Sequence, residues 1–221
     1  MTQTEIDQET ILELANAGVL YGHKKSKTHP KMRVFIGAQR NEIEILKPEL
    51  VLRRLEKALE FLREKRKNNG TILIVGTIVS AHEAVKKFAD AFGFPCVTTR
   101  WLGGTLTNWN KVKERVKYYL DLKERKEKGE LAKYPKKEQV DFAKELEKLQ
   151  QKFEGIKNMT KLPEVLFVID PKAHAIAIRE AKALNIPVVA IVDTNDNPTE
   201  VTLPIVANDH ARASINWIID K

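Results

Sequence analysis

The sequence lacks several features that particular classes of protein need. It has one cysteine, Cys96, in 221 residues, which excludes an internal disulfide. Its apolar runs, such as Val165 to Ile169, are much too short to cross a bilayer. The start of the chain, MTQTEIDQETILELANAG, lacks the cationic region and the continuous apolar stretch of a signal peptide. We therefore expect a globular cytoplasmic protein.

Sequence signatures of catalysis and of nucleotide binding are also missing. The chain contains no GxGxxG, Walker A, HExxH, EF-hand or nucleophile-elbow pattern. The turn after the apolar run at 71–75 has one glycine, Gly76, so we interpret it as a tight strand exit rather than a phosphate cradle. We predict that the protein is not an enzyme and has no cofactor or catalytic metal.

Positive charge, in contrast, is abundant and unevenly distributed. The chain has 38 Lys and Arg against 30 Asp and Glu, a formal net charge of +8. Residues 21–70 contain 14 basic and 6 acidic side chains, and residues 107–160 contain 15 and 10. Basic surfaces attract polyanions, of which nucleic acid is the most common in the cytosol. The alternative is a lysine-rich face that only keeps the protein soluble.

The spacing of apolar residues predicts the fold class. Short β-branched runs at 71–75, 165–169 and 187–192 alternate with amphipathic stretches of helical spacing at 80–92 and 174–184. Strands that are apolar on both faces and alternate with helices indicate a doubly wound α/β domain, with a mainly parallel sheet and helices on both faces. The other expected elements are a helix at 8–17, an irregular basic loop at 22–37, a helix at 50–67, short strands at 95–98 and 205–206, and a last helix near 210–219.

One long segment interrupts this alternation. Residues 107–158 contain two stretches with apolar residues at helical spacing, separated by the helix breakers Gly129 and Pro135. We predict an antiparallel helical hairpin, wound as a coiled coil, whose arms reach roughly 30 Å from the domain. The expected organisation is the first part of the α/β domain at 1–106, the inserted hairpin at 107–158 and the remainder of the α/β domain at 159–221.

The loop at 22–37 has the composition of an RNA contact. It combines cations with Ser26, Thr28 and the histidines His23 and His29, a mixture that supplies phosphate contacts from an irregular backbone. Both histidines stand among lysines, which disfavours a cation site in this loop. The candidate RNA-binding residues here are Lys24, Lys25, Lys27, Lys31 and Arg33.

A second candidate contact is the segment RWLGGTLTN at 100–108. Its adjacent glycines allow a sharp turn before a helix, whose free N–H groups and neighbouring hydroxyls favour an anionic oxygen. Trp101 and Trp109 have a competing interpretation, as packing anchors between the hairpin and the domain. The candidate RNA-binding residues here are Arg100, Trp101, Thr105, Thr107 and Asn108, with Lys111 at the start of the hairpin.

Acidic residues that follow the last predicted strands allow an enzymatic alternative. At the carboxyl edge of the sheet, where such folds bind ligands, they can hold a divalent metal or act as general acid and base. The same residue types also form helix caps and turns, which is the interpretation we favour. The alternative is an enzyme that acts on a nucleotide or sugar phosphate through Asp170 and Asp193. The residues concerned are Asp170, Asp193, Asp196, Asp209, His174 and His210.

Four longer motifs carry a family resemblance. They are AGVLYGHKKSKTHPKM at 17–32, RWLGGTLTNW at 100–109, GIKNMTKLPEVLFVIDP at 155–171 and IPVVAIVDTNDNP at 186–198. In this order they resemble the bacterial-type ribosomal protein S-two family over nearly the whole chain. The resemblance implies a non-enzymatic structural constituent of the small ribosomal subunit that binds 16S ribosomal RNA and takes part in translation. Other small-subunit proteins are implied partners, with the S-one protein as a further candidate.

Two stretches depart from the pattern of that family. Residues 41–48 read NEIEILKP where NGIHIIDL is usual, so Glu44 stands in place of a histidine and we expect no particular RNA contact there. Residues 206–215 read VANDHARASI where PGNDDAIRSI is typical, which puts His210 in place of an aspartate.

Overall fold

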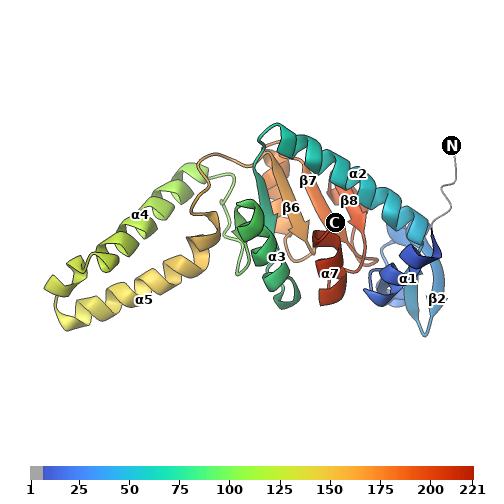
Figure 1. Ribbon diagram of the computed structural model, residues 1–221, viewed down its shortest axis with the longest axis horizontal. Coiled ribbons are helices and arrows are strands. Elements are labelled where there is room, and N and C mark those ends of the chain that lie inside the picture. The colour runs from blue at the N-terminus through green and yellow to red at the C-terminus, as the bar shows by residue number, and fades with distance from the viewer. Residues whose placement is uncertain (1–6) are drawn as a thin grey trace.

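A five-stranded parallel sheet forms the centre of the structure, a computed structural model that describes residues 7–221 (Figure 1). Every residue of the three inner strands β4, β6 and β7 is buried, since helices cover both faces of the sheet. The predicted doubly wound α/β class is confirmed. In the order in which they pair, the strands are β5 (Cys96–Val97), β4 (Ile72–Val75), β6 (Val165–Ile169), β7 (Val188–Val192) and β8 (Leu203–Val206).

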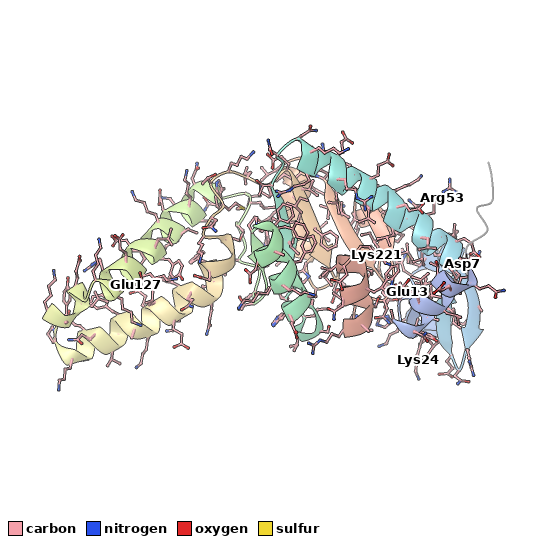
Figure 2. The ribbon with its side chains drawn as sticks, in the orientation of Figure 1. Asp7, Glu13, Lys24, Arg53, Glu127 and Lys221 are labelled. Carbon is pink, nitrogen blue, oxygen red and sulfur yellow. The ribbon has the colours of Figure 1, made fainter. Side chains whose placement is uncertain are left out.

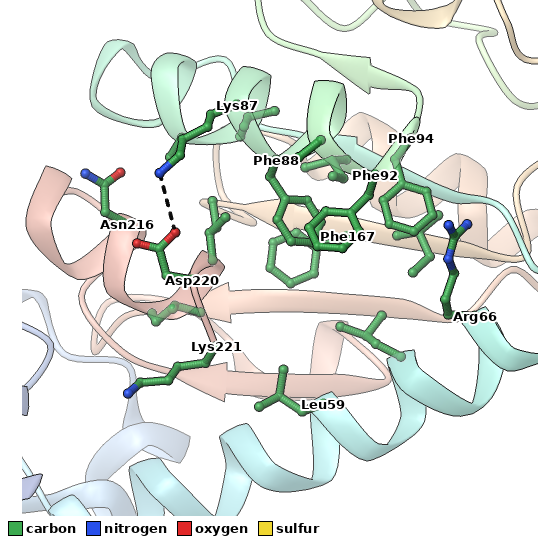
Figure 3. A pocket seen from close by; sticks show the side chains of 18 of the residues that line it. Leu59, Arg66, Lys87, Phe88, Phe92, Phe94, Phe167, Asn216, Asp220 and Lys221 are labelled. Carbon is green, nitrogen blue, oxygen red and sulfur yellow. Dashed lines mark ion pairs between the residues drawn. The ribbon is translucent and has the colours of Figure 1, made fainter.

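The order of the strands explains how helices come to lie on both faces. α3 (Val79–Phe92) connects β4 to β5, whereas α6 (Ala175–Ala183) connects β6 to β7 in the opposite direction along the sheet. Because such crossovers are right-handed, α3 and α6 lie on opposite faces. α2 (Pro48–Lys67) and α7 (Arg212–Ile219) share the face of α3. Between these three helices lies an apolar groove of about 740 Å³, with Phe167 at its base (Figure 3).

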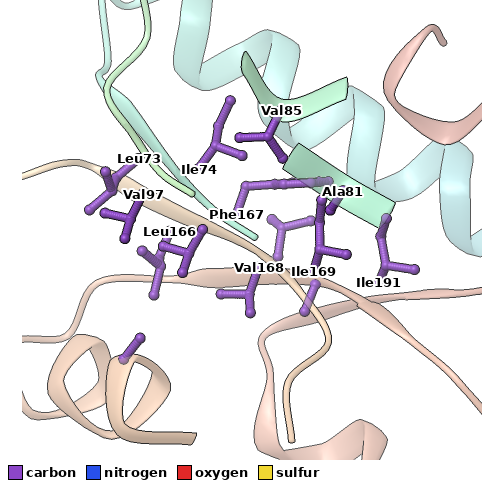
Figure 4. Packing of buried hydrophobic residues seen from close by; sticks show 14 of the residues in the cluster. Leu73, Ile74, Ala81, Val85, Val97, Leu166, Phe167, Val168, Ile169 and Ile191 are labelled. Atoms are coloured by element: carbon purple, nitrogen blue, oxygen red, sulfur yellow. The ribbon is translucent and has the colours of Figure 1, made fainter. Parts of the chain in front are cut away.

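Strand side chains alternate between the two halves of the core. Phe167 points to α3, where Val85 is fully buried, while Leu166 points to the opposite face (Figure 4). The exit of β4 is tight, because a Cβ at Gly76 would lie 3.1 Å from the side chains of Ile169 and Val85. The interpretation of Gly76 as a strand exit therefore agrees with the structure.

The basic segment at 22–37 is more ordered than the sequence predicts. β1 (Tyr21–Lys24), β2 (Ile36–Arg40) and β3 (Ile43–Leu46) form a separate antiparallel sheet in the order β1-β3-β2. The prediction of an irregular loop is wrong, because strands occupy its ends and the 3-10 helices η1 (Lys25–Lys27) and η2 (Pro30–Phe35) lie between them.

The remaining helices agree with the sequence pattern. α1 (Gln8–Asn16) ends just before Gly18, whose φ of 75° suits a glycine. α2 begins at Pro48, two residues before the predicted start at Leu50, because proline is well accommodated in a first helical turn. Within residues 7–221, no helix combines the length and the apolar character that crossing a bilayer requires.

Two long helices extend away from the sheet from the segment that the sequence assigns to a hairpin (Figure 1). The helical spacing of the first stretch includes Leu120 among the residues expected between the two helices, but Leu120 is 40% exposed and Leu122 is buried there instead. The two helices and the break between them are confirmed, whereas their winding as a coiled coil and the boundaries at 106/107 and 158/159 stay predictions. The elements are α4 (Trp109–Glu127), η3 (Glu130–Lys133), α5 (Lys136–Phe153) and η4 (Glu154–Ile156).

Candidate nucleic-acid interface

The basic segment presents its cations to solvent. Lys24 ends β1, η1 carries two of the lysines, and η2 carries the last lysine and the arginine. Among the described residues, Lys24 is the one cation of this group that forms an ion pair, 3.3 Å from Glu42. Figure 2 shows Lys24 on the side of the molecule opposite Glu127 of the hairpin. The exposed cations are Lys24, Lys25, Lys27, Lys31 and Arg33.

Contacts with the carboxyl end of β7 hold the basic segment in place. The backbone N–H of His23 donates to Thr194 Oγ1 at 2.8 Å, and the N–H of His29 donates to the Thr194 carbonyl oxygen at 2.8 Å. A Cβ at Gly22 would lie 2.3 Å from the Thr194 side chain, so glycine is needed for this close approach. Phe35 is buried beneath the segment. The cations therefore project from a backbone that is anchored to the central sheet.

The turn at 100–108 encloses a carboxylate of the protein itself. Glu180 of α6 is only 8% exposed. Its Oε1 accepts from the Trp101 indole at 3.0 Å and from the Gly104 N–H at 2.8 Å. Its Oε2 accepts from the N–H groups of Leu106 at 3.0 Å and Thr107 at 3.2 Å. The anionic oxygen that this turn was predicted to attract is present in the structure as Glu180.

Glu180 is ionised in this environment. Burial by itself raises the pKa of a carboxyl group, but the hydrogen bonds from Trp101 and from the backbone of the turn outweigh it and hold the pKa of Glu180 below its usual value. The local sequence gives no signal for this residue, because a glutamate between Arg179 and Ala181 in an amphipathic helix is typical of a solvated position.

The predicted RNA-binding residues of the turn differ in exposure. Arg100 and Asn108 are exposed, and so is Lys111, which pairs with Glu114 at 3.0 Å. Thr105 is buried, and its hydroxyl donates to a backbone carbonyl of the same turn at 2.6 Å. RNA contacts by these residues stay predictions.

Trp101 and Thr107 each make a side-chain contact with the protein itself, although Thr107 is exposed. Trp101 is half-buried, as is Trp109, which packs against the core. The hydroxyl of Thr107 donates to Glu180 Oε2 at 3.2 Å. The interpretation of the tryptophans as packing anchors agrees with this geometry, and RNA contacts by Trp101 and Thr107 stay predictions.

The acidic residues at the carboxyl edge of the sheet act partly as caps and turn formers. Asp170 Oδ1 accepts from the Ala173 N–H at 2.9 Å, and Asp196 Oδ2 accepts from the Asp193 N–H at 3.1 Å. His174 is buried, with its Nδ1 2.8 Å from the Asp170 carbonyl oxygen. The favoured interpretation therefore accounts for these contacts.

Capping leaves part of this acidic cluster unexplained. Within residues 7–221, the buried Asp209 Oδ2 has no hydrogen-bond partner. His23 Nδ1 lies 3.0 Å from Asp193 Oδ2, and the ring of His210 lies edge-on to that of His23, with centroids 5.3 Å apart. Ligand atoms of Asp193, His23 and His210 lie within 4.8 Å of one another, and so do those of Asp170, Asp209 and His210. Both groups are close enough to share a metal ion, because the fold brings His23 beside buried carboxylates. The expectation that this segment holds no cation site stays a prediction.

Burial changes the ionisation of the acidic cluster. Burial, together with the nearby charge of Asp209, raises the pKa of Asp196 to about 7. The hydrogen bond from its ring to Asp209 raises the pKa of His210 from 6.5 to about 9, and Asp193 raises the pKa of His23 in the same way. Near neutral pH the cluster therefore holds protons that the same groups release in the unfolded chain.

We expect the stability of the protein to fall as the pH rises from 6.5 to about 9, because His210 loses its proton over this range. The folded state binds this proton more tightly than the unfolded state, so its stabilisation is complete below 6.5 and is lost as the pH rises through 9. Thermal unfolding midpoints measured in EDTA should decrease over this range, and His210→Gln should flatten the decrease. An equally steep decrease in the variant contradicts the assignment to His210.

The doubly wound sheet, the long helical pair and the exposed cations define a basic α/β protein whose surface suits a polyanion. The family profile described as Ribosomal protein S2 matches residues 14–221, nearly the whole chain. The chain belongs to the ribosomal protein S2 family. This family is a structural one, so the chain is not an enzyme and the alternative of a nucleotide- or sugar-phosphate enzyme is rejected.

Individual relatives agree with the family assignment. The chain is 43% identical over 209 residues to the small ribosomal subunit protein uS2 of Dictyoglomus thermophilum. The aligned region covers 95% of this chain and 85% of that protein. The chain is 42% identical over 212 residues to the protein of the same name from Coprothermobacter proteolyticus, covering 96% of this chain and 79% of that protein. The resemblance inferred from the four sequence motifs is confirmed.

Proposed function

We propose that this protein is a structural constituent of the small ribosomal subunit and that it binds 16S ribosomal RNA. The observation that carries the proposal is the family match, which spans residues 14–221 and includes both candidate RNA-binding segments. Its role in translation is positional, and the cytoplasm is where a bacterial ribosomal subunit works. The other proteins of the small subunit are its protein partners in this role.

The first RNA-binding surface in this proposal is the basic segment. Lys24 ends β1, and the other exposed cations stand on the 3-10 helices η1 and η2. The backbones of His23 and His29 tie this segment to Thr194. Cations on a fixed backbone neutralise phosphates and release counterions without first ordering a loop. Such an arrangement reads the shape of folded RNA rather than its base sequence.

The second RNA-binding surface is the hairpin with its root, residues 100–158. The side chains that face away from the seam of α4 and α5 include many exposed lysines, with Arg100 and Lys111 near the root. We propose that residues 107–158 are an insertion into one α/β domain formed by 1–106 and 159–221. The hairpin and the basic segment then hold two RNA regions at a fixed distance.

The S-one protein is a finer proposal for a partner and rests on the family resemblance alone. Binding of the S-one protein requires a surface of this chain that stays accessible after the chain has bound RNA. A pull-down of S-one by reconstituted small subunits with and without this chain tests it, and equal recovery of S-one in both would overturn it.

Sedimentation with small ribosomal subunits tests the function directly. Subunits depleted of their own copy of the family member should bind this chain at about 0.1 M salt and release it at about 1 M, because phosphate contacts are screened. A chain in which a short Gly-Ser linker replaces residues 110–152 should bind more weakly. If the intact chain stays in the supernatant at low salt, the proposal fails. If the shortened chain keeps its RNA affinity but loses protein partners, the hairpin is a protein-binding arm instead.

A further inference from the structure

The Glu180 carboxylate lies where the hairpin joins the α/β domain. The turn at 100–108 that surrounds it follows β5 and ends at Asn108, the residue before α4. Glu180 itself belongs to α6, which packs on the sheet through Ala177 and Ala181, both fully buried. A side chain from the rigid domain therefore holds the segment from which the first hairpin helix starts.

Five donors of the turn converge on this one side chain. They lie 2.8 to 3.2 Å from its two oxygens, so the carboxylate has about as many partners as it can accept. These donors are distributed along the turn from Trp101 to Thr107. They therefore fix the backbone conformation of the whole turn and not of a single residue. The positive φ of Gly104, 88°, lets its N–H point to Glu180.

The second hairpin helix returns to the domain at a separate point. η4 packs against β5, and a Cβ at Gly155 would lie 2.1 Å from the Cys96 carbonyl oxygen. Polar contacts therefore hold the start of α4 at the hairpin root through Glu180, and η4 packs the end of α5 against β5 at the same root. Without Glu180 the turn loses its five polar contacts, and the hairpin keeps the η4 contact and the apolar packing of the turn, which fix its direction less tightly.

We infer that Glu180 is a positioning residue for RNA binding, because it sets the direction in which the hairpin leaves the α/β domain. The inference rests on the proposed function, in which the basic segment and the hairpin bind two regions of one RNA. Two linked sites gain affinity when their spacing matches the target, since the second contact then forms at a high effective concentration. Glu180 acts through the turn and contacts no RNA.

Distance measurements on Glu180→Ala test the positioning directly. Spin labels on cysteines placed at Lys65 in α2 and Lys126 in α4, in a Cys96→Ser background, report the distance between the domain and the hairpin. We expect a narrow distance distribution with Glu180 present and a distinctly broader one in Glu180→Ala. Lys182→Ala changes an exposed neighbour on the same helix and should keep the narrow distribution. A narrow distribution in Glu180→Ala overturns the inference.

Filter binding to 16S ribosomal RNA over a salt series separates positioning from charge. Glu180→Ala leaves the cations in place, so the affinity should fall by roughly tenfold while the slope against salt stays the same. An unchanged affinity, despite a broader distance distribution, overturns the role in RNA binding. If the unmodified chain does not bind the RNA, the proposed function fails and this inference fails with it. That outcome is recognisable because it does not involve the variant.

Small carboxylates supply a test that loss of folding cannot mimic. Acetate can enter the space left by Glu180→Ala and accept from the same N–H groups, so it should narrow the distance distribution and restore RNA affinity. Chloride at the same concentration should do neither, and equal effects of the two salts overturn the inference. If the alanine variant does not fold, Glu180→Gln takes its place, since it keeps the volume and one acceptor oxygen and should give an intermediate loss.

Discussion

Alanine at four lysines of the basic segment is expected to weaken binding to 16S ribosomal RNA by roughly a hundredfold at about 0.1 M salt. The slope of log affinity against log salt should become less steep by about 3 to 4, because each lysine that contacts a phosphate releases about one counterion. Filter binding across a salt series measures both quantities. The substitutions are Lys24→Ala, Lys25→Ala, Lys27→Ala and Lys31→Ala.

A matched control removes the same charge elsewhere. If the affinity for RNA depended only on net charge, the control variant would lose as much affinity as the four-lysine variant. We expect its slope to stay close to that of the unmodified chain. An unchanged slope in the four-lysine variant would show that the basic segment does not contact phosphates. The control substitutes the exposed residues Lys86, Lys87, Lys172 and Lys182 with alanine.

Among glycine-to-alanine substitutions near the hairpin root, Gly155→Ala is expected to destabilise the protein most. The new Cβ would lie 2.1 Å from the Cys96 carbonyl oxygen and 3.1 Å from its carbonyl carbon. Backbone atoms cannot rotate away as a side chain can, so η4 has to move off β5. Overpacking of this kind costs about 3 kcal/mol. Thermal unfolding should therefore show a midpoint lower by roughly 10 °C.

Gly103→Ala provides the comparison for this prediction. A Cβ at Gly103 meets no atom of residues 7–221 within 4 Å, and the φ of Gly103 is not positive. The substitution should leave the midpoint within about 2 °C of the original, with a small gain possible from a stiffer unfolded chain. Equal midpoints for the two variants would mean that η4 and β5 are not packed as described.

The parts of the fold that the sequence predicted well have strong local signals. β6 and β7 are uninterrupted apolar runs, and an amphipathic stretch follows β6. Each could therefore be predicted as strand or helix from its own residues. The edge strand β5 has only two residues, and its place beside β4 comes from the crossover through α3. The short strands predicted at 95–98 and 205–206 are present as β5 and β8, but their order in the sheet follows from the crossovers and not from their own residues.

The small antiparallel sheet shows why the basic segment was mistaken for an irregular loop. β1 is polar at most positions, so it lacks the alternation that marks a half-buried strand. The turn between β2 and β3 places Asn41 and Glu42 at φ values of 49° and 66°. A tight hairpin turn of this kind usually carries glycine, and Glu42 conceals the signal.

The residues of the candidate site were the hardest to predict, because most of them meet through contacts between positions that are distant in sequence. The cations of the basic segment were found from composition, because exposed charge needs no partner to be recognised. Glu180 and the turn that it holds are more than seventy positions apart in sequence. His23 and Asp193 are farther apart still, and each looks ordinary in its own segment.

Local chemistry alone determined the class of this protein: alternating strands and helices, a long helical insertion, an excess of exposed lysine, and the motifs of the ribosomal protein S2 family. Tertiary structure decided which charges meet. A parallel sheet collects the ends of β6, β7 and β8 at one edge, which brings together Asp170, Asp193 and Asp209. The same packing places Glu180 inside the turn. Those pairings depend on the direction of each crossover, a property of the whole chain that no single segment encodes.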